Sequence, residues 1–178
     1  GVQYVIAVPH NIVGPRQKYD DPFRNVMSIM LNRMLQGKQP IIYGDGEQQR
    51  CFSYIDDCLY CLNALAFQDN VVGEVINIGP DEEFITINEL FEKISNKLQF
   101  NKGAEYHKSR PNEVFKALCS SDKARDLLSY KTSVTLDESL DSMIKYIKEK
   151  GPKKFEYNYE IEIENDEIIP KTWKNKIF

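Results

Sequence analysis

Two apolar runs stand out from an otherwise amphipathic chain. VQYVIAV (2–8) leads into the polar loop Pro9-His10-Asn11, and GEVINIG (73–79) carries Asn77 just before its end. Runs that are apolar at both alternating positions and rich in Val and Ile are typical of strands buried between two layers. We therefore predict two buried strands. A polar group at the end of such a strand is a site candidate, because ligands bind beyond the carboxyl ends of parallel strands.

Five segments carry apolar residues at helical spacing, near 22–36, 57–67, 86–98, 121–129 and 136–149. We expect the first helix to begin with Asp20 or Asp21 as its N-cap and to end at Gly37. The Asp56-Asp57 pair is expected to cap the second helix, and Thr86 to open a capping box in the third.

Shorter apolar or alternating stretches predict strands near 40–43, 51–55, 104–108 and 115–119. The tail, with FEYNYEIEIE at 155–164, predicts one exposed or edge strand. Two long buried strands mixed with short irregular ones favour an α/β fold, in which the last units of a parallel sheet are interleaved with a small α+β lobe.

Composition limits the possible partners. The 178 residues are 42% hydrophobic and 28% charged, which suffices for one core with a lobe attached. The net charge of -4 argues against general binding of nucleic acid or anionic membrane. No apolar stretch approaches the roughly 20 residues that span a bilayer, and no signal-peptide pattern is present, so we expect a cytoplasmic protein. Because the chain opens inside a core strand, we infer the carboxyl-terminal part of a longer protein or a fold lacking partners on one side.

Several patterns suggest chemistry that their context argues against. Cys58 and Cys61 have metal-site spacing, but they lie at helical positions without a second pair, so we expect buried, reduced thiols. Tyr146 and Lys150 match Tyr-x-x-x-Lys, yet they lie at the end of the last helix. We assign no catalytic residue and no metal ligand to this chain.

Arg50, after the turn Gly44-Asp45-Gly46, and Arg110, before a proline, lie where the backbone geometry is restricted. Guanidinium groups bind phosphate oxygens in bidentate fashion, so two of them could hold a diphosphate. Surface positions are the alternative for each arginine. Asn11 and Asn77 could bind phosphate or sugar oxygens, or could serve turns and caps.

Five motifs in order resemble one known family. They are NIVGPRQ (11–17), PIIYGDGEQQRCFSYIDD (40–57), VINIG (75–79), RPNEV (110–114) and SVTLDESL (133–140). Together they resemble the carboxyl-terminal half of the extended short-chain dehydrogenase/reductase family, over about 1–150. The chain is most similar to its NAD-dependent nucleotide-sugar epimerases and dehydratases, with the UDP-glucose 4-epimerases as the nearest branch.

The resemblance implies the fold, the ligands and the site. The fold would be the last strands and helices of an NAD-binding Rossmann-type parallel sheet, at 1–17 and 55–80. A substrate-binding lobe would follow at 18–54 and 81–150, with an extension at 151–178. By resemblance, Pro9 and His10 lie near the nicotinamide of NAD and Asn11 near the sugar-phosphate. The other implied substrate contacts are Val26 at the nucleotide, Tyr43 at the pyrimidine base, Arg50, Arg110 and Asn77 at the diphosphate, and Glu113 near the ribose.

Two departures bear on the function. Cys51 stands where the family most often has aspartate, a change also met in nucleotide-sugar decarboxylases, and Pro9-His10 replaces an Arg/aromatic pairing. The glycine-rich phosphate loop and the catalytic Tyr-x-x-x-Lys are missing from these 178 residues, so we expect this chain alone to be inactive. The whole enzyme, a homodimer by resemblance, would be a UDP-hexose 4-epimerase (an isomerase of carbohydrate metabolism). The alternatives are a 4,6-dehydratase, a decarboxylase or a non-catalytic nucleotide-sugar binding module.

Overall fold

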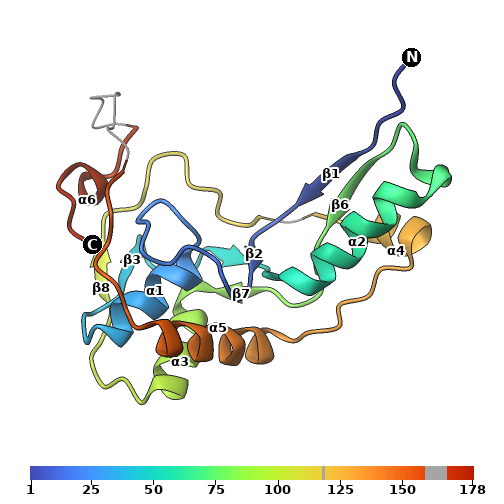
Figure 1. Cartoon of the computed structure of the whole chain (residues 1–178). Coiled ribbons are helices and arrows are strands. Elements are labelled where there is room, and N and C mark those ends of the chain that lie inside the picture. The colour runs from blue at the N-terminus through green and yellow to red at the C-terminus, as the bar shows by residue number, and fades with distance from the viewer. Residues whose placement is uncertain (118, 159–167) are drawn as a thin grey trace.

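The computed structural model describes residues 1–117, 119–158 and 168–178, and its elements form two groups joined by extended connections (Figure 1). One group contains β1 (Ile6–Pro9), α2 (Ile55–Phe67), β6 (Val75–Ile78) and α4 (Asp122–Leu128). The other contains α1 (Val26–Leu35), β3 (Ile41–Tyr43), α3 (Ile87–Leu98), β8 (Glu105–His107), α5 (Leu136–Lys150) and α6 (Lys171–Lys174). Between them lie β2 (Ile12–Val13), β4 (Gln49–Arg50), β5 (Ser53–Tyr54) and β7 (Ile85–Thr86), while a 3-10 turn (Asp69–Val71) follows α2.

The described strands pair two by two. β1 with β6, β2 with β5 and β3 with β8 are parallel, while β4 and β7 are antiparallel. Parallel pairs need crossover connections, and the long segments between the partners, with their helices, supply them. The predicted mixed α/β class with parallel strands is confirmed.

The expected burial of the two long strands on both faces is wrong for this chain. Ile6 and Val8 of β1 are 46% and 42% exposed, and Val75 of β6 is 48% exposed, whereas Ile76 and Ile78 are buried. The reason is that, among the described residues, α2 and α4 pack on the face of this pair that carries Ile76 and Ile78. The opposite face, which carries Ile6, Val8 and Val75, is left exposed.

Helix starts differ from the sequence expectation in two places. α1 begins at Val26, because Asn25 accepts the backbone N–H of Met27, while Asp21 binds the N–H of Phe23 and the guanidinium of Arg24 in a preceding turn. α2 begins at Ile55, one residue before the Asp pair. Asp57 does not cap the helix, and instead accepts hydrogen bonds from the backbone N–H and hydroxyl of Ser133.

Other local predictions hold. Thr86 forms the capping box of α3 with Glu89, and Gly37 follows α1 with φ +72°. The helices near 121–129 and 136–149 are α4 and α5. Near 115–119 the described residues contain only an isolated bridge between Gln49 and Lys116, in place of a strand.

The tail differs from the single edge strand that was expected. Residues 151–158 contain no strand, and α6 follows at 171–174 and packs on the second group of elements. The backbone N–H of Glu156 binds the carbonyl of Asp20. The middle of the predicted strand, 159–167, lies outside the described residues.

The buried apolar residues form two clusters. The larger lies between α1, α3 and α5, and the smaller joins α2, β6 and α4 through residues such as Cys58, Ile76 and Leu128. α4 belongs to the predicted lobe 81–150 but packs with the β1/β6 group, and the predicted domain boundaries remain an expectation. Within the described ranges, every helix is too short or too polar to cross a bilayer.

We expect Leu140→Ala in α5 to lower the free energy of unfolding by about 3 kcal/mol, because it opens a cavity in the larger cluster. Leu140 is fully buried, whereas Leu59 on α2 is 52% exposed. Leu59→Ala is therefore the matched control, with an expected change under about 0.5 kcal/mol. Urea unfolding of both variants measures this difference, and equal losses would contradict the assignment of the core.

Candidate functional site

Two arginines from separate segments meet around one carboxylate. Arg50 Nη2 lies 3.0 Å from Glu113 Oε1, and Arg110 Nε lies 2.7 Å from Glu113 Oε2. Arg110 Nη2 also binds Oε1, so both oxygens of Glu113 are engaged. The structure thus brings together the two arginines, 60 positions apart in the sequence, that were predicted to bind a diphosphate.

Short strands position this cluster. Arg50 ends β4, whose pairing with β7 fixes its backbone, and its Nη1 donates to the carbonyl of Gln49 at 2.7 Å. Arg110 and Glu113 lie in the loop after β8, where Asn112 adopts φ +54°. The backbone N–H of Gln49 donates to the carbonyl of Phe115, which ties this loop to β4.

The cluster carries one net positive charge. Two of its members are shielded from water, since the side chains of Arg50 and Glu113 are 14% and 12% exposed, whereas that of Arg110 is 36% exposed. Burial lowers the pKa of Arg50, while the hydrogen bonds that Arg110 donates to Glu113 raise the pKa of Arg110. Both guanidinium groups remain charged at neutral pH, because arginine does not lose its proton in proteins.

A cavity of about 120 Å³ adjoins the cluster. Its polar wall is formed by Arg50, Arg110 and Glu113, and its apolar wall by residues that include Phe23, Val26 and Trp173. Two larger cavities share lining residues with it. One of about 370 Å³ is lined by both arginines and Trp173, and one of about 410 Å³ is lined by Tyr43 and Thr172.

Tyr43 lines both the 120 Å³ cavity and the 410 Å³ cavity. The guanidinium carbon of Arg110 lies 5.1 Å from the centre of its ring, a cation–π arrangement. The Tyr43 hydroxyl lies 2.5 Å from the hydroxyl of Thr172, which precedes Trp173 in α6. Burial raises the pKa of Tyr43, so this hydroxyl stays protonated at neutral pH.

The two predicted asparagines lie apart from each other. Asn11 Nδ2 donates to the carbonyl of Cys51, so Asn11 contacts the residue that follows Arg50 in the chain. Asn77, in register with Val8 of β1, donates to the carbonyl of Ser120. Neither asparagine is among the residues that line the three cavities, and their predicted contacts with a substrate remain proposals.

Pro9 and His10 lie at the carboxyl end of β1. His10 Nε2 lies 3.1 Å from the carbonyl oxygen of Pro80, and Nδ1 lies 3.0 Å from Cys119 Sγ. Both ring nitrogens are therefore engaged within the chain, so His10 could offer a cofactor only the surface of its ring. These two residues are a poor fit to NAD by themselves, and their predicted contact with the cofactor remains a proposal.

Sequence reasoning missed part of the apolar wall. Trp173 comes from the tail that was expected to be an edge strand, and Phe23 from the loop before α1. Their rings meet edge to face with centroids 5.0 Å apart. The available signal was the chain's single tryptophan, in a tail rich in aromatic residues.

The cysteines are free, as expected. Cys51, Cys58 and Cys61 are buried and Cys119 is half-buried. In the part of the chain that the structure describes, no three His, Cys, Asp or Glu residues are arranged to hold a metal ion. Tyr146 packs edge to face on Tyr19 at 6.2 Å, which explains its position on α5 by packing.

Comparison with known proteins shows which family the chain resembles. Residues 1–79 match the model of the NAD dependent epimerase/dehydratase family. A relative from Methanocaldococcus jannaschii, provisionally named a UDP-glucose 4-epimerase, is 35% identical over 150 residues, which cover 83% of this chain and 47% of the relative. The chain belongs to the NAD-dependent epimerase/dehydratase family.

Further relatives of this epimerase/dehydratase chain include enzymes of two kinds. The UDP-glucuronic acid 4-epimerase of Bacillus cereus, solved with UDP-glucuronic acid and NAD, has a TM-score of 0.75 at 32% identity, over 83% of this chain and 46% of that one. A UDP-N-acetyl-alpha-D-glucosaminuronate decarboxylase of Bacillus cytotoxicus is 41% identical over 83 residues, or 47% of this chain and 25% of the relative. The chain spans about half the length of the relatives it matches.

We expect the buried thiols of this family member to react slowly with an aromatic disulfide reagent. Burial raises the pKa of Cys51, Cys58 and Cys61 to about 11, so only about one thiol in a thousand is the reactive thiolate at pH 8. Cys119 should react first, because it is the least buried, and Cys119→Ala should remove that phase. Unfolding in guanidinium should make all four thiols react rapidly, and a fast native phase that survives Cys119→Ala would contradict this prediction.

Proposed function

We propose that this chain supplies the nucleotide-diphosphate anchor of a UDP-sugar 4-epimerase. The observation that carries the proposal is the convergence of Arg50 and Arg110 on a cavity wall, with Glu113 between them. Family membership and the relatives solved with UDP sugars support it.

The anchor would act at a distance from the chemistry. Two guanidinium forks can share the oxygens of adjacent phosphates through charge-assisted hydrogen bonds. Glu113 would orient both forks and leave one net positive charge for the ligand. Holding the diphosphate fixes the attached sugar ring, and binding energy from a remote group of this kind can be used to orient the reacting centre.

Hydride transfer lies outside what this chain's residues supply. In the whole enzyme, NAD would supply hydride chemistry at the sugar, held mainly by residues outside these 178. Tyr146 and Lys150 lie on α5, where Tyr146 packs against Tyr19, so they cannot serve as the proton-transferring pair at this cavity. We propose accordingly that the chain alone binds UDP but does not convert UDP-glucose, and that the whole enzyme is a cytoplasmic homodimer.

A nucleotide-sugar decarboxylase is the second candidate, favoured by the 41% identity to the Bacillus cytotoxicus enzyme and by Cys51. Both candidates share the diphosphate anchor. They differ in the sugar, since a decarboxylase must accept a carboxylate on it. Markedly tighter binding of UDP-glucuronic acid than of UDP-glucose would favour an enzyme acting on a uronic acid, and equal binding would favour the hexose epimerase.

We predict that Arg50→Ala and Arg110→Ala each weaken UDP binding by about 2 kcal/mol, the range for hydrogen bonds to charged groups. Isothermal titration calorimetry with UDP measures this loss. Lys123→Ala is the control. It removes a cation of α4 that is ion-paired with Glu74 and lines none of the three cavities. Wild-type affinity in both arginine variants would overturn the proposed anchor.

A further inference from the structure

The C-terminal segment, residues 168–178, forms one wall of the cavity beside the arginine cluster. Trp173 lines both the 120 Å³ cavity and the 370 Å³ cavity, and Phe178 lines the smaller one. Figure 1 shows α6 beside β3 and β8, at the end of the molecule where the C-terminus lies. The segment is thus part of the site, although none of the five sequence motifs includes it.

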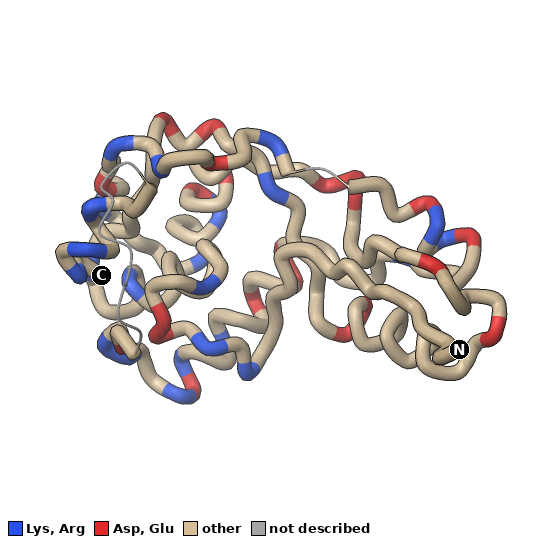
Figure 2. The backbone as a smooth tube through the Cα atoms, turned by 90° about the horizontal axis from the view of Figure 1, so that it is seen from above, with Lys and Arg blue, Asp and Glu red and all other residues tan. Residues whose placement is uncertain are grey.

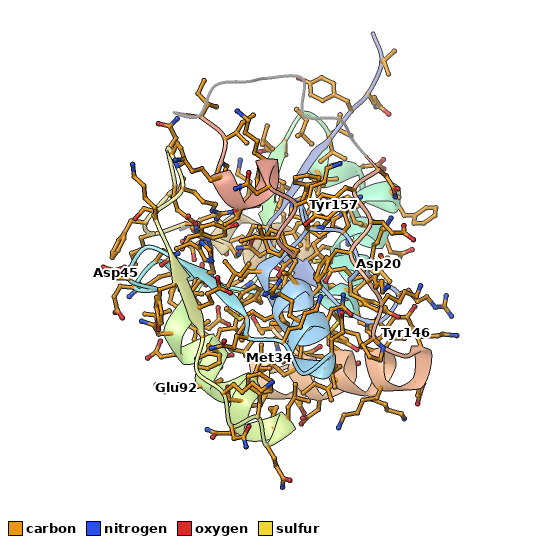
Figure 3. The ribbon with its side chains drawn as sticks, turned by 90° about the vertical axis from the view of Figure 1, so that its left-hand side faces the viewer. Asp20, Met34, Asp45, Glu92, Tyr146 and Tyr157 are labelled. Carbon is orange, nitrogen blue, oxygen red and sulfur yellow. The ribbon has the colours of Figure 1, made fainter. Side chains whose placement is uncertain are left out.

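Specific contacts hold this segment in place. The hydroxyl of Thr172, a buried residue, meets that of Tyr43, and Trp173 packs on Phe23. Arg33 of α1 donates from Nη1 to the carbonyl of Ile177 at 3.1 Å. The backbone N–H of Phe178 donates to the hydroxyl of Tyr157, which is labelled in Figure 3. A segment fixed at several points can present a side chain to a ligand in a defined position.

The small cavity has two chemically different sides. Arg50 and Arg110 provide guanidinium groups suited to phosphate oxygens. Phe23, Trp173 and Val26 provide a wall of aromatic and aliphatic surface within the same cavity. A ligand that matches both sides carries phosphates joined to a flat, weakly polar ring, which describes a nucleotide.

The charged side chains of the C-terminal segment are basic. Residues 168–178 contain Lys171, Lys174 and Lys176 and no Asp or Glu. Figure 2 shows this concentration of basic residues at the C-terminal end. Cationic side chains near the site attract an anionic ligand.

We propose that Trp173 forms the wall that holds the nucleobase of the bound nucleotide, and that the C-terminal segment therefore favours nucleotides over a free diphosphate at this site. The inference rests on the proposed function, because it takes the arginine cluster as the phosphate end. An indole face or edge gives a base favourable contact irrespective of its hydrogen-bonding pattern, so Trp173 would contribute affinity for the base as a ring.

The test compares UDP with inorganic pyrophosphate, which lacks the nucleoside. By calorimetry on the 178-residue chain, Trp173→Ala should weaken UDP binding roughly tenfold, within the range measured for base–aromatic contacts. The same variant should leave pyrophosphate affinity unchanged within about twofold, whereas Arg50→Ala should weaken both ligands. Trp173 is the chain's single tryptophan, so UDP should also change the intrinsic fluorescence at 295 nm excitation in a saturable manner.

Two further variants separate a binding role from a structural one. Trp173→Phe keeps a ring against Phe23, and we expect it to restore most of the UDP affinity. Phe67→Ala removes an aromatic ring that is 82% exposed on α2 and should change neither ligand. Should Trp173→Ala lower the melting temperature strongly, the comparison of Trp173→Phe with wild type and the fluorescence change still decide the question.

The outcomes are distinct. If UDP binds but Trp173→Ala leaves its affinity unchanged or raises it, the nucleobase wall is overturned while the arginine anchor stands. If Trp173→Ala weakens UDP and pyrophosphate equally, the segment serves the phosphate end or the fold, which also overturns the inference. If the wild-type chain binds neither ligand, both the inference and the proposed function fail.

Discussion

The carboxylate of Glu113 allows the arginine cluster to exist. Two guanidinium groups brought together away from water repel each other, and burial alone disfavours their charged forms. Glu113 offsets both effects by accepting hydrogen bonds from Arg50 and Arg110 with its two oxygens. The compensation is partial by count, since two cations face one anion. The site is therefore assembled in advance and still attracts negative charge, which is the electrostatic condition for binding a diphosphate.

The loop that carries Arg110 and Glu113 depends in turn on short strands. β4 is two residues long, and it is held on one side by β7 and on the other by the loop backbone at Phe115. Hydrogen bonds of this kind fix the backbone with few residues, so the cavity wall is built without a continuous sheet. The same region receives α6, so chain segments from residue 22 to residue 178 meet around one cavity.

Local signals predicted the helices well and their starts less well. The capping box predicted at Thr86 is complete in the structure, because its hydrogen bonds form within four residues, and the structure adds a second capping box at Thr135. Asp21 was a plausible cap by type, but a tighter turn with Phe23 uses it, a competition that residue type alone cannot decide. The convergence of Arg50 and Arg110 followed from the order of family motifs. The position of Trp173 did not, because the docking of the tail depends on tertiary contacts with Phe23 and Tyr43 that leave no periodic pattern in the sequence.

Gly79 occupies the point where the two groups of elements join. Its φ is +144°, and a β-carbon there would lie 2.4 Å from the ring of His10 and 2.3 Å from the hydroxyl of Ser53. That hydroxyl donates to the carbonyl of His10, so the segments that carry His10 and Ser53 both pack against the α-hydrogen side of Gly79. The relative placement of β1, β5 and β6 is thereby set by a contact without adjustable side-chain volume. A methyl group added at Gly79 would have to displace His10. It would thereby shift the neighbouring Asn11, whose side chain binds the segment that carries Arg50.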